Sequence, residues 1–539
     1  MATTPDKKTQ VLDFTTYKAT HKLKVLAARP FDLTTEGNLT PERINRYCAS
    51  AVDFKLLYGT ERIDDATMNA LFELAEEAQV HDKMQKMQAG EVLNVIQGYP
   101  SENRSVLHTA TRDFFEQPQT SEIARAAAHD AKAEVLKLKD FIDKLDRDGT
   151  FTDLIMIGIG GSDLGPRAHY FALQHLLKKN RNVRFICNLD PDDTASAMLG
   201  IDLKKALVVV VSKTGTTLET LSNEMFVKRY FTEAKLKPEE HFVTVSLKGS
   251  PLDDRSKYLE CFYMWDWIGG RYSTTSMVGG VMLSFAFGFN VFWEFLRGAN
   301  AMDKAVLNPD PKQNLSLIAA LLGIWNRTFL HYPSLAIIPY SQALWRYTAH
   351  IQQLDMESNG KHIDKHGNVV TFDTGPILWG EAGTNSQHSF FQMIHQGTTV
   401  VPLEFVGFKE SQMQKDNVYN GTTSQQKLLS NLFAQMLGLA TGQTNENPNK
   451  VFEGNRPSHL LLGKQLTPHA LGALLSFFEH KIAFQGFIWN INSFDQEGVQ
   501  LGKVLANKII GCFAAQNEQL KETQLYPLGD ALLRQLDTF

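Results

Sequence analysis

Apolar side chains in the first 150 residues recur three or four positions apart, which is the spacing of one helix face. The pattern predicts helices over 65–87 and 121–145. Thr40 followed by Pro41 is typical of a helix start, because Thr caps free backbone N–H groups and Pro fits the first helical position. We therefore expect this part of the chain to be mainly helical.

From residue 151 to about 290, short apolar runs alternate with helical stretches. The runs that we expect to be strands cover residues 153–158, 183–187, 206–212, 242–246 and 262–265. Such alternation predicts a parallel sheet covered by helices on both faces. Ligands of these sheets bind beyond the carboxyl ends of the strands, so the loops that follow the runs are candidate sites.

A polar stretch over 297–315, which carries Pro309 and Pro311, separates this block from a second one. There we expect strands at 335–339, 377–379 and 399–405, helices over 341–355 and from about Gln387, a polar loop at 443–457, and helices over 468–485, 498–516 and 528–536. The second block alternates like the first, which indicates a duplicated α/β architecture.

Composition narrows the class of protein. A chain of 539 residues with 43% hydrophobic and 21% charged residues is typical of a globular protein of two or three domains. Its net charge of −5 does not indicate a nucleic-acid partner. Four widely spaced cysteines and an N-terminus without an apolar core favour the reducing cytoplasm. The uncharged stretch 272–293 is long enough to span a membrane, but its serines, threonines and glycines favour a buried core helix.

The first candidate site follows the apolar run 154–157, where residues 158–165 read GIGGSDLG. Glycines let the backbone approach a ligand, and a following helix offers free N–H groups to an anion, so Gly161 and Ser162 are candidate contacts. Asp163 stands where the dinucleotide fingerprint needs a third glycine, and no Gly-Lys-Ser/Thr closes the run as in a P-loop. A tight turn without a ligand is the alternative.

The second candidate site follows the valine-rich run 206–211 and reads SKTGTT. The hydroxyls of Ser212, Thr214 and Thr217 can donate to phosphate oxygens, and Lys213 supplies a positive charge. No acidic residue is placed to hold Mg²⁺ as in a nucleotide hydrolase, so a phosphomonoester is favoured over a nucleotide. The alternative is a turn that only caps the next helix.

Four other residues could carry acid–base or charge chemistry. Arg271 follows two glycines and could reach a developing oxyanion, Glu357 at an expected helix end could be a base, and His388 in GTNSQH could be an acid or base. Lys503 lies seven residues after Gln496, which is one helix face if a helix begins early enough. Taken singly, each also fits a structural or solvated side chain.

His362 and His366 have the spacing of two zinc ligands on a helix. Gly360 and Gly367 flank them, and the Glu of H-E-x-x-H is absent. We therefore expect a loop here and no metal site.

Six motifs together resemble the glucose-6-phosphate isomerase family. They are GIGGSDLG at 158–165, SKTGTT at 212–217, DWIGGRYS at 266–273, ESNGK at 357–361, GTNSQH at 383–388 and FDQEGVQLGK at 494–503. The resemblance runs from about Glu102 to Lys503 and implies an α/β fold of two SIS domains, each a flavodoxin-like parallel sheet sandwiched by helices, with helical extensions at both ends. It implies a helical segment at 1–120, SIS domains at 121–292 and 326–505, a linker at 293–325 and a helical segment at 506–539.

The resemblance also implies a role for each candidate. The residues that hold the phosphate are Gly161, Ser162, Ser212, Lys213, Thr214 and Thr217, with Gln496 closing on it. Glu357 is the base that moves a proton between C2 and C1, Arg271 stabilises the cis-enediolate, and His388 and Lys503 assist ring opening. The implied assembly is a homodimer in which His388 comes from the partner subunit, and neither a metal nor a cofactor is implied.

The chain departs from the family pattern at Glu497, Gln500 and Thr111, where Trp, Glu and Leu are usual. The expected activity is the interconversion of glucose 6-phosphate and fructose 6-phosphate in glycolysis and gluconeogenesis. Two alternatives stay open: a non-catalytic SIS-type sensor of sugar phosphates, and an isomerase that also accepts mannose 6-phosphate. A sensor could dispense with Glu357, Arg271 or Lys503, and this chain has all three.

Overall fold

The structure is a computed structural model that describes residues 13–518 and 526–536. It divides into two compact units, one up to Ser493 and one from Phe494 onward, and each is described by itself. The elements before the first sheet are α1 Lys18–Ala27, α2 Pro41–Arg46, β1 Cys48–Ala51, β2 Phe54–Leu57, α3 Asp65–Glu77, α4 Val80–Ala89, β3 Val92–Asn94, β4 Arg104–Ser105 and α5 Glu122–Asp148.

This N-terminal part is mainly helical, as predicted, with two differences. The expected helix over 65–87 is two helices, α3 and α4, because Gln79 between them has a left-handed φ of 54°. The short strands β1, β2, β3 and β4 were not predicted. The predicted cap at Thr40 is confirmed, since its side chain accepts a hydrogen bond from the backbone N–H of Arg43 at the start of α2.

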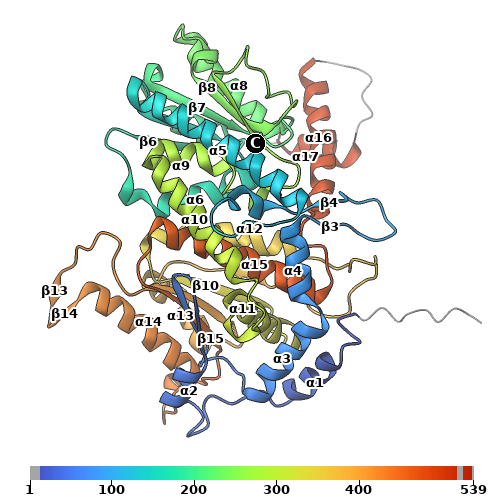
Figure 1. Cartoon of the computed structure of the whole chain (residues 1–539), viewed down its shortest axis with the longest axis vertical. Helices are drawn as coiled ribbons and strands as arrows, with labels where there is room; N and C mark the ends of the chain where they lie inside the picture. The colour runs from blue at the N-terminus through green and yellow to red at the C-terminus, as the bar shows by residue number, and fades with distance from the viewer. Residues whose placement is uncertain (1–12, 519–525, 537–539) are drawn as a thin grey trace, which may run out of the picture. The chain divides into compact units, whose positions relative to one another are not determined.

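The first sheet is fully parallel and has the strand order β6-β5-β7-β8-β9. Its strands are β5 Asp153–Ile157, β6 Asn182–Ile186, β7 Ala206–Val211, β8 Phe242–Leu247 and β9 Glu260–Met264, and its helices are α6 Leu164–Ala172, α7 Pro191–Met198, α8 Leu218–Glu233 and α9 Met277–Phe287. All five expected strands are confirmed within two residues. Figure 1 shows helices on both sides of this sheet.

The core of this block follows the two-residue period of its strands. Ile155 of β5 and Val208 of β7 pack against Val227 and Phe231 of α8, while the intervening strand residues face the other side, where α9 contacts β5 and β7. Every residue of β7 is buried, which explains its unbroken apolar sequence.

The uncharged stretch forms α9 and the beginning of α10 Phe289–Ala305. All eleven residues of α9 are buried in the protein core, which confirms the expected core helix, and Gly288 (φ 93°) separates the two helices. Among residues 13–518 and 526–536, no helix combines the length and apolar character that a bilayer span requires.

The second sheet has the order β1-β2-β15-β12-β10-β11. Its later elements are α11 Leu315–Ile324, β10 Ser334–Pro339, α12 Tyr347–Asn359, β11 Ile377–Trp379, α13 Phe391–Gln396, β12 Leu403–Phe408, α14 Ser424–Thr441, β15 Ser458–Gly463 and α15 Pro468–Trp489; a small β13 Val418–Tyr419 and β14 Thr422–Thr423 pair lies apart. The strands β10, β11, β12 and β15 are parallel. The expected duplication is therefore present as two sheets with helices, of which the first is fully parallel and the second has a parallel part of four strands.

The second block differs from expectation at four places. The strand expected at 399–405 begins at Leu403, because Pro402 has no N–H to donate to a ladder. The helices expected from 341 and from about Gln387 begin at Tyr347 and Phe391, each after a tighter turn. The hairpin β1–β2 extends the sheet by pairing antiparallel with β15, with Leu56 opposite Leu461.

The helix α15 is buried along nearly its whole length and contacts α10, α11 and α12. In Figure 1 it lies with α10 between the two sheets. The second unit consists of α16 Gln500–Glu518 and α17 Pro527–Leu536, close to the helices expected at 498–516 and 528–536.

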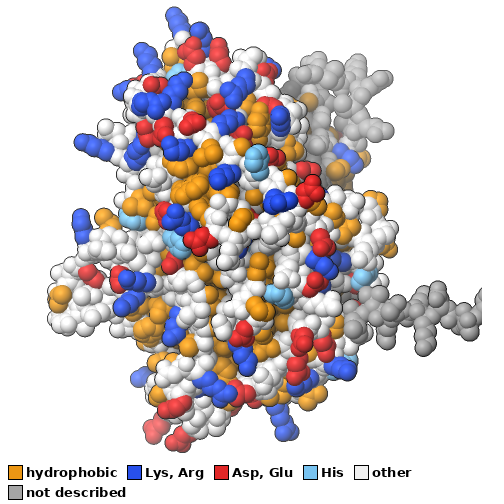
Figure 2. All heavy atoms as spheres, viewed as in Figure 1, with side chains coloured by type: hydrophobic (Ala, Val, Ile, Leu, Met, Phe, Trp, Pro, Cys, Tyr) orange, Lys and Arg blue, Asp and Glu red, His pale blue; other side chains and the backbone are white. Residues whose placement is uncertain are grey.

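On the face seen in Figure 2, basic and acidic side chains are interspersed rather than gathered into one patch. The four cysteines are free thiols.

Candidate active site

Two glycine loops of the first sheet meet in backbone contact. The turn Gly160–Ser162 follows β5, and the turn Gly270–Tyr272 follows β9. A Cβ added to Gly161 would lie 2.1 Å from the carbonyl carbon of Gly270, so no side chain fits at position 161. A Cβ on Gly160 would lie 3.4 Å from Nε2 of Gln353 on α12. The first glycine loop therefore lies against the Arg271 turn and close to α12.

The SKTGTT loop folds into a compact turn before α8. The hydroxyls of Ser212 and Thr217 lie 2.9 Å apart, and Ser212 Oγ also accepts from the backbone N–H of Gly215. Thr214 and Thr216 pair their hydroxyls at 2.8 Å on the exposed side. Gly215 has a φ of 68°, a conformation that glycine adopts without strain. The turn thus collects several donor groups next to the first residues of a helix.

Lys213 joins this loop to the segment before Arg271. Its Nζ donates to the carbonyl oxygens of Asp266 at 2.7 Å and Ile268 at 2.9 Å. Burial, reinforced by the positive charge of Arg104, lowers the pKa of Lys213 to about 8, although Asp266 acts in the opposite direction. The amine therefore titrates much closer to neutrality than an exposed lysine does.

Arg271 is buried, and its guanidinium is held along one edge. Its Nε donates to Ser358 Oγ at 2.7 Å, and its Nη2 donates to the carbonyl oxygen of Ser493 at 2.6 Å. Its Nη1 lies 3.4 Å from Oε2 of Glu357. The cation is thus held in place beside the carboxylate of Glu357.

Glu357 lies in the last turn of α12, where the sequence analysis expected a helix end. Its side chain is 22% exposed, whereas that of Arg271 is 1% exposed. The carboxylate is therefore accessible from outside, and the cation backs it from the protein interior. Lys361 closes the helix by donating from Nζ to the carbonyl oxygen of Glu357 at 2.7 Å.

The remaining predicted residues, His388, Gln496 and Lys503, lie on later segments of the chain. His388 is exposed at the end of the turn Asn385–His388, and among residues 13–518 and 526–536 no hydrogen bond or ion pair links its side chain to Glu357 or Arg271. Gln496 directly precedes the turn Glu497–Val499, and Lys503 is exposed on the first turn of α16, both in the second unit.

His362 and His366 lie in a loop, as predicted, and His366 pairs its Nδ1 with Oε1 of Gln97 at 2.8 Å. Within the described ranges, no group of three or more His, Cys, Asp or Glu side chains is arranged to hold a metal ion.

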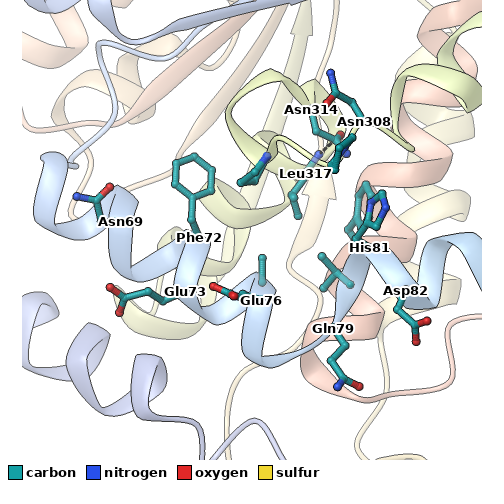
Figure 3. A pocket seen from close by; sticks show the side chains of 15 residues that line it. Asn69, Phe72, Glu73, Glu76, Gln79, His81, Asp82, Asn308, Asn314 and Leu317 are labelled. Atoms are coloured by element: carbon teal, nitrogen blue, oxygen red, sulfur yellow. Dashed lines mark hydrogen bonds between the residues drawn. The ribbon is translucent and has the colours of Figure 1, made fainter.

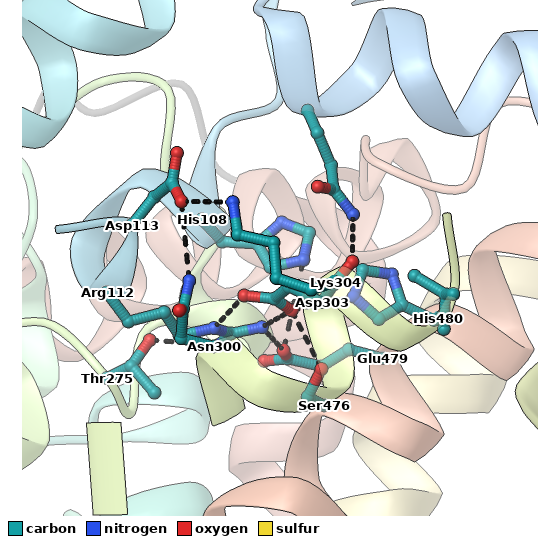
Figure 4. A network of polar contacts seen from close by, with 12 residues as sticks. His108, Arg112, Asp113, Thr275, Asn300, Asp303, Lys304, Ser476, Glu479 and His480 are labelled. Carbon is teal, nitrogen blue, oxygen red and sulfur yellow. Dashed lines mark hydrogen bonds and ion pairs between the residues drawn. The ribbon is translucent and has the colours of Figure 1, made fainter. Parts of the chain in front are cut away.

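Figure 4 shows a buried ionic network around Arg112 and Asp303. Arg112 donates to both carboxylate oxygens of Asp303 at 2.7 and 2.8 Å and to Glu479 at 2.7 Å. Burial acts to raise the pKa of Asp303, but Arg112 and His480 outweigh it and hold the pKa below its ordinary value. Burial raises the pKa of Glu479 to about 7 against the opposing effect of Arg112. Sequence reasoning did not single out these residues, because they are far apart along the chain.

The network is linked to the candidate site by His108, whose ring stacks on Tyr272. The His108 ring stacks on Tyr272, with ring centroids 4.6 Å apart, and His108 Nε2 lies 3.9 Å from Glu479 Oε2. Sequence reasoning also missed Tyr272 and Ser358, the neighbours of Arg271 and Glu357. Their position inside the motifs DWIGGRYS and ESNGK was the only available signal.

A cavity of about 770 Å³ lies elsewhere, between α3, α4 and the start of α11 (Figure 3). Its walls include Phe72, Glu76, His81 and Asn314, and it contains none of the candidate residues. Its size alone therefore gives no reason to connect it with the chemistry of Glu357 and Arg271.

Comparison with known proteins adds independent information. The family model described as phosphoglucose isomerase matches residues 57–523. Glucose-6-phosphate isomerase of Protochlamydia amoebophila is 61% identical over 533 residues, which is 99% of each chain, and that of Chlamydia abortus is 52% identical over 501 residues, 93% of this chain and 94% of that one.

The fold is also found in solved structures. A crystal structure of a glucose-6-phosphate isomerase from Chlamydia trachomatis superposes with a TM-score of 0.94 at 48% identity, covering 98% of this chain and all of that one. A hypothetical protein from Thermus thermophilus shares the fold with a TM-score of 0.64 at 24% identity, over 84% of this chain and 99% of that one. The chain belongs to the phosphoglucose isomerase family.

Proposed function

We propose that this chain interconverts glucose 6-phosphate and fructose 6-phosphate through a cis-enediolate. The observation that carries the proposal is the pairing of one accessible carboxylate, Glu357, with one buried guanidinium, Arg271, at 3.4 Å. Aldose–ketose isomerisation needs a base for a carbon-bound proton and a cation beside the developing enediolate. The relatives named glucose-6-phosphate isomerase support the choice of substrate.

The loops around this pair supply the expected phosphate anchor. In the proposal the phosphate is held by Gly161, Ser162, Ser212, Lys213, Thr214 and Thr217, and Gln496 closes on it. The hydroxyls of Ser212 and Thr217 come together in one turn, and the carbonyls that Lys213 contacts belong to the segment that leads to Arg271. Anchoring a non-reacting group here supports catalysis by orienting the sugar toward the base.

The reaction begins with the closed sugar. His388 and Lys503 assist ring opening, in which the O1 hydroxyl loses its proton, the C1–O5 bond breaks and O5 gains a proton. Glu357 then removes the proton from C2, and the electron pair forms the C1–C2 double bond of the enediolate. Arg271 stabilises the charge on its oxygens. The proton on O2 then moves to O1, and the protonated Glu357 returns its proton to C1, which leaves a ketone at C2 and a hydroxyl at C1; no step uses a metal or cofactor.

We further propose that the protein acts as a homodimer in the cytoplasm, in glycolysis and gluconeogenesis, with His388 contributed by the partner subunit. The exposure of His388 and its lack of a described contact with Glu357 support this. The domain division proposed with it has SIS domains at 121–292 and 326–505, a linker at 293–325, and helical segments at 1–120 and 506–539.

A coupled assay tests the activity. Fructose 6-phosphate is supplied, and the glucose 6-phosphate formed is detected by its NADP-linked dehydrogenase, with and without EDTA. Turnover that survives EDTA is expected. A folded protein that binds the sugar phosphate without turning it over would contradict the proposal and favour a sensor. Repeating the assay with mannose 6-phosphate, using detection of fructose 6-phosphate, decides whether that sugar is also accepted.

A further inference from the structure

The last turn of α12 contacts the Arg271 guanidinium through Glu357 and Ser358, and its next residue, Asn359, contacts Ser493 behind the guanidinium. Glu357 faces its Nη1, and Ser358 accepts from its Nε at 2.7 Å. Asn359 Oδ1 accepts from Ser493 Oγ at 2.7 Å, and the carbonyl oxygen of Ser493 accepts from Nη2. Asn359 is itself fixed, since its Nδ2 donates to the carbonyl oxygen of Ile482 at 3.1 Å. The same helix turn that presents the carboxylate therefore also orients the cation.

Ser358 has a second partner on the Arg271 turn. Its Oγ lies 3.0 Å from the hydroxyl of Tyr272, so the residue after the base and the residue after the arginine are joined. Both side chains are buried. Burial raises the pKa of Tyr272 to about 12, against the effects of Arg271 and Ser358, so the hydroxyl keeps its proton at neutral pH.

The Tyr272 ring is held from behind. It stacks on His108, and His108 lies against Glu479 of the buried network, whose Oε2 accepts from Arg112. Because the ring lies between this network and α12, its hydroxyl stays directed at Ser358. A serine hydroxyl has two lone pairs and one proton, which is enough to serve Arg271 and Tyr272 together.

We propose that Ser358 and Tyr272 are positioning residues that hold Arg271 with Nη1 directed at the reacting atoms beside Glu357. The guanidinium is planar, and its five N–H donors have a fixed geometry, so fixing Nε also fixes the direction of Nη1. Without the Ser358 hydroxyl the guanidinium keeps its contact with the carbonyl oxygen of Ser493 but loses the partner that fixes Nε. The inference rests on the proposed function, because it assigns the pair a role in that reaction.

The positioning role predicts a specific kinetic pattern. The phosphate anchor lies on other loops, so substrate binding is retained when Ser358 or Tyr272 loses its hydroxyl. The transition state, by contrast, depends on where the Arg271 charge lies. Loss of the hydroxyl therefore lowers kcat while KM changes little. A purely structural role would instead lower the stability of the protein and leave the activity of the folded fraction unchanged.

The test uses Ser358→Ala, Tyr272→Phe and the double variant of the full chain in the coupled assay. Ser358→Ala is expected to lower kcat at least about tenfold with KM within about twofold, since small displacements of a positioned group cost large rate factors. Tyr272→Phe keeps the ring on His108 and lowers kcat in the same direction. Because both act on one guanidinium, the double variant is expected to lose less than the product of the two single losses.

Ser284→Ala and Tyr347→Phe are matched controls. Both hydroxyls are buried and have no partner among the described residues, so their removal is expected to leave kcat unchanged. An active wild type with kcat unchanged in Ser358→Ala and Tyr272→Phe would overturn the positioning role alone. Losses confined to KM or to thermal stability would also overturn it. An inactive wild type would overturn the proposed function, and this role with it.

Discussion

The backbones of Gly161 and Gly270 touch, so that a Cβ on Gly161 would overlap the peptide group after Gly270. This contact brings the loop after β5 against the turn that carries Arg271. The relation is not symmetric, because a Cβ on Gly270 would meet its nearest atom, the Cα of Gly161, at 3.8 Å, which is ordinary packing. The two glycines therefore make a matched pair for mutation.

Gly161→Ala is expected to separate the two loops, because the new Cβ would meet backbone atoms of Gly270 and Arg271 that no side-chain rotation can move. Overpacking of this kind costs about 1–3 kcal/mol of the free energy of unfolding. The displaced Arg271 turn also lowers kcat/KM. Urea unfolding and the coupled assay check both effects. Gly270→Ala serves as the control, and equal losses in the two variants would contradict the packing argument.

Lys213 is expected to make kcat/KM depend on pH. Its pKa of about 8 in the folded protein lies below the ordinary 10.5, so the amine loses its charge as the pH rises through about 8. Since the charged form attracts the substrate phosphate, kcat/KM for fructose 6-phosphate is expected to fall above that pH. Lys213→Arg keeps the charge at all these pH values. In the pH profile of kcat/KM, the basic limb of Lys213→Arg is expected to move to higher pH. A limb at the same pH as in the wild type would show that another group titrates.

Substitution of Asp303 in the buried ionic network is expected to lower the free energy of unfolding strongly. Asp303 is fully enclosed and accepts from Arg112, Ser476 and His480. Asp303→Asn leaves the Arg112 charge with one carboxylate partner fewer, and breaking a buried ion pair costs about 3–5 kcal/mol. Urea unfolding measures this loss in the free energy of unfolding. Glu233→Gln, which removes an exposed partner of Arg229, is expected to leave the free energy of unfolding nearly unchanged. Similar losses in both variants would contradict the distinction between the buried and the exposed ion pair.

The proposed shared site predicts complementation between two inactive variants. In a dimer of one Glu357→Gln chain and one His388→Asn chain, one site receives both lesions and the other receives neither. Random mixing by unfolding and refolding together is therefore expected to restore about a quarter of the wild-type activity. Each variant refolded alone is the control. No recovery in a mixture that contains mixed dimers would mean that His388 serves its own chain.

Much of the fold follows from local sequence. The strand β7 is a run of six apolar residues, as burial on both faces requires. The uncharged stretch 272–293 contains the buried core helix α9 and the first residues of α10. The hairpin β1–β2 could not be predicted in the same way. Its pairing partner β15 lies about 400 residues away, with Leu57 opposite Leu460, and only tertiary structure brings them together.

The residues of the candidate site also divide into those that local motifs predict and those that only tertiary contacts reveal. Gly161, Lys213, Arg271 and Glu357 were recognisable from their motifs, and contacts on their loops connect them. Ser358 and Tyr272 were not recognised, because a serine and a tyrosine beside charged residues have no periodic or spacing signal. Their importance in the structure comes from one hydrogen bond between them, 86 residues apart in the chain.

The central claim is that Glu357 carries the proton between C2 and C1. Conversion of glucose 6-phosphate in D₂O, followed by NMR, tests it directly, because a proton held by a carboxylate exchanges with solvent. The wild type is expected to place deuterium at C1 of fructose 6-phosphate. Glu357→Gln is expected to lower both conversion and incorporation by about 10²–10⁴-fold, while the exposed control Glu446→Gln matches the wild type. Deuterium incorporation by Glu357→Gln at the wild-type rate would contradict the account.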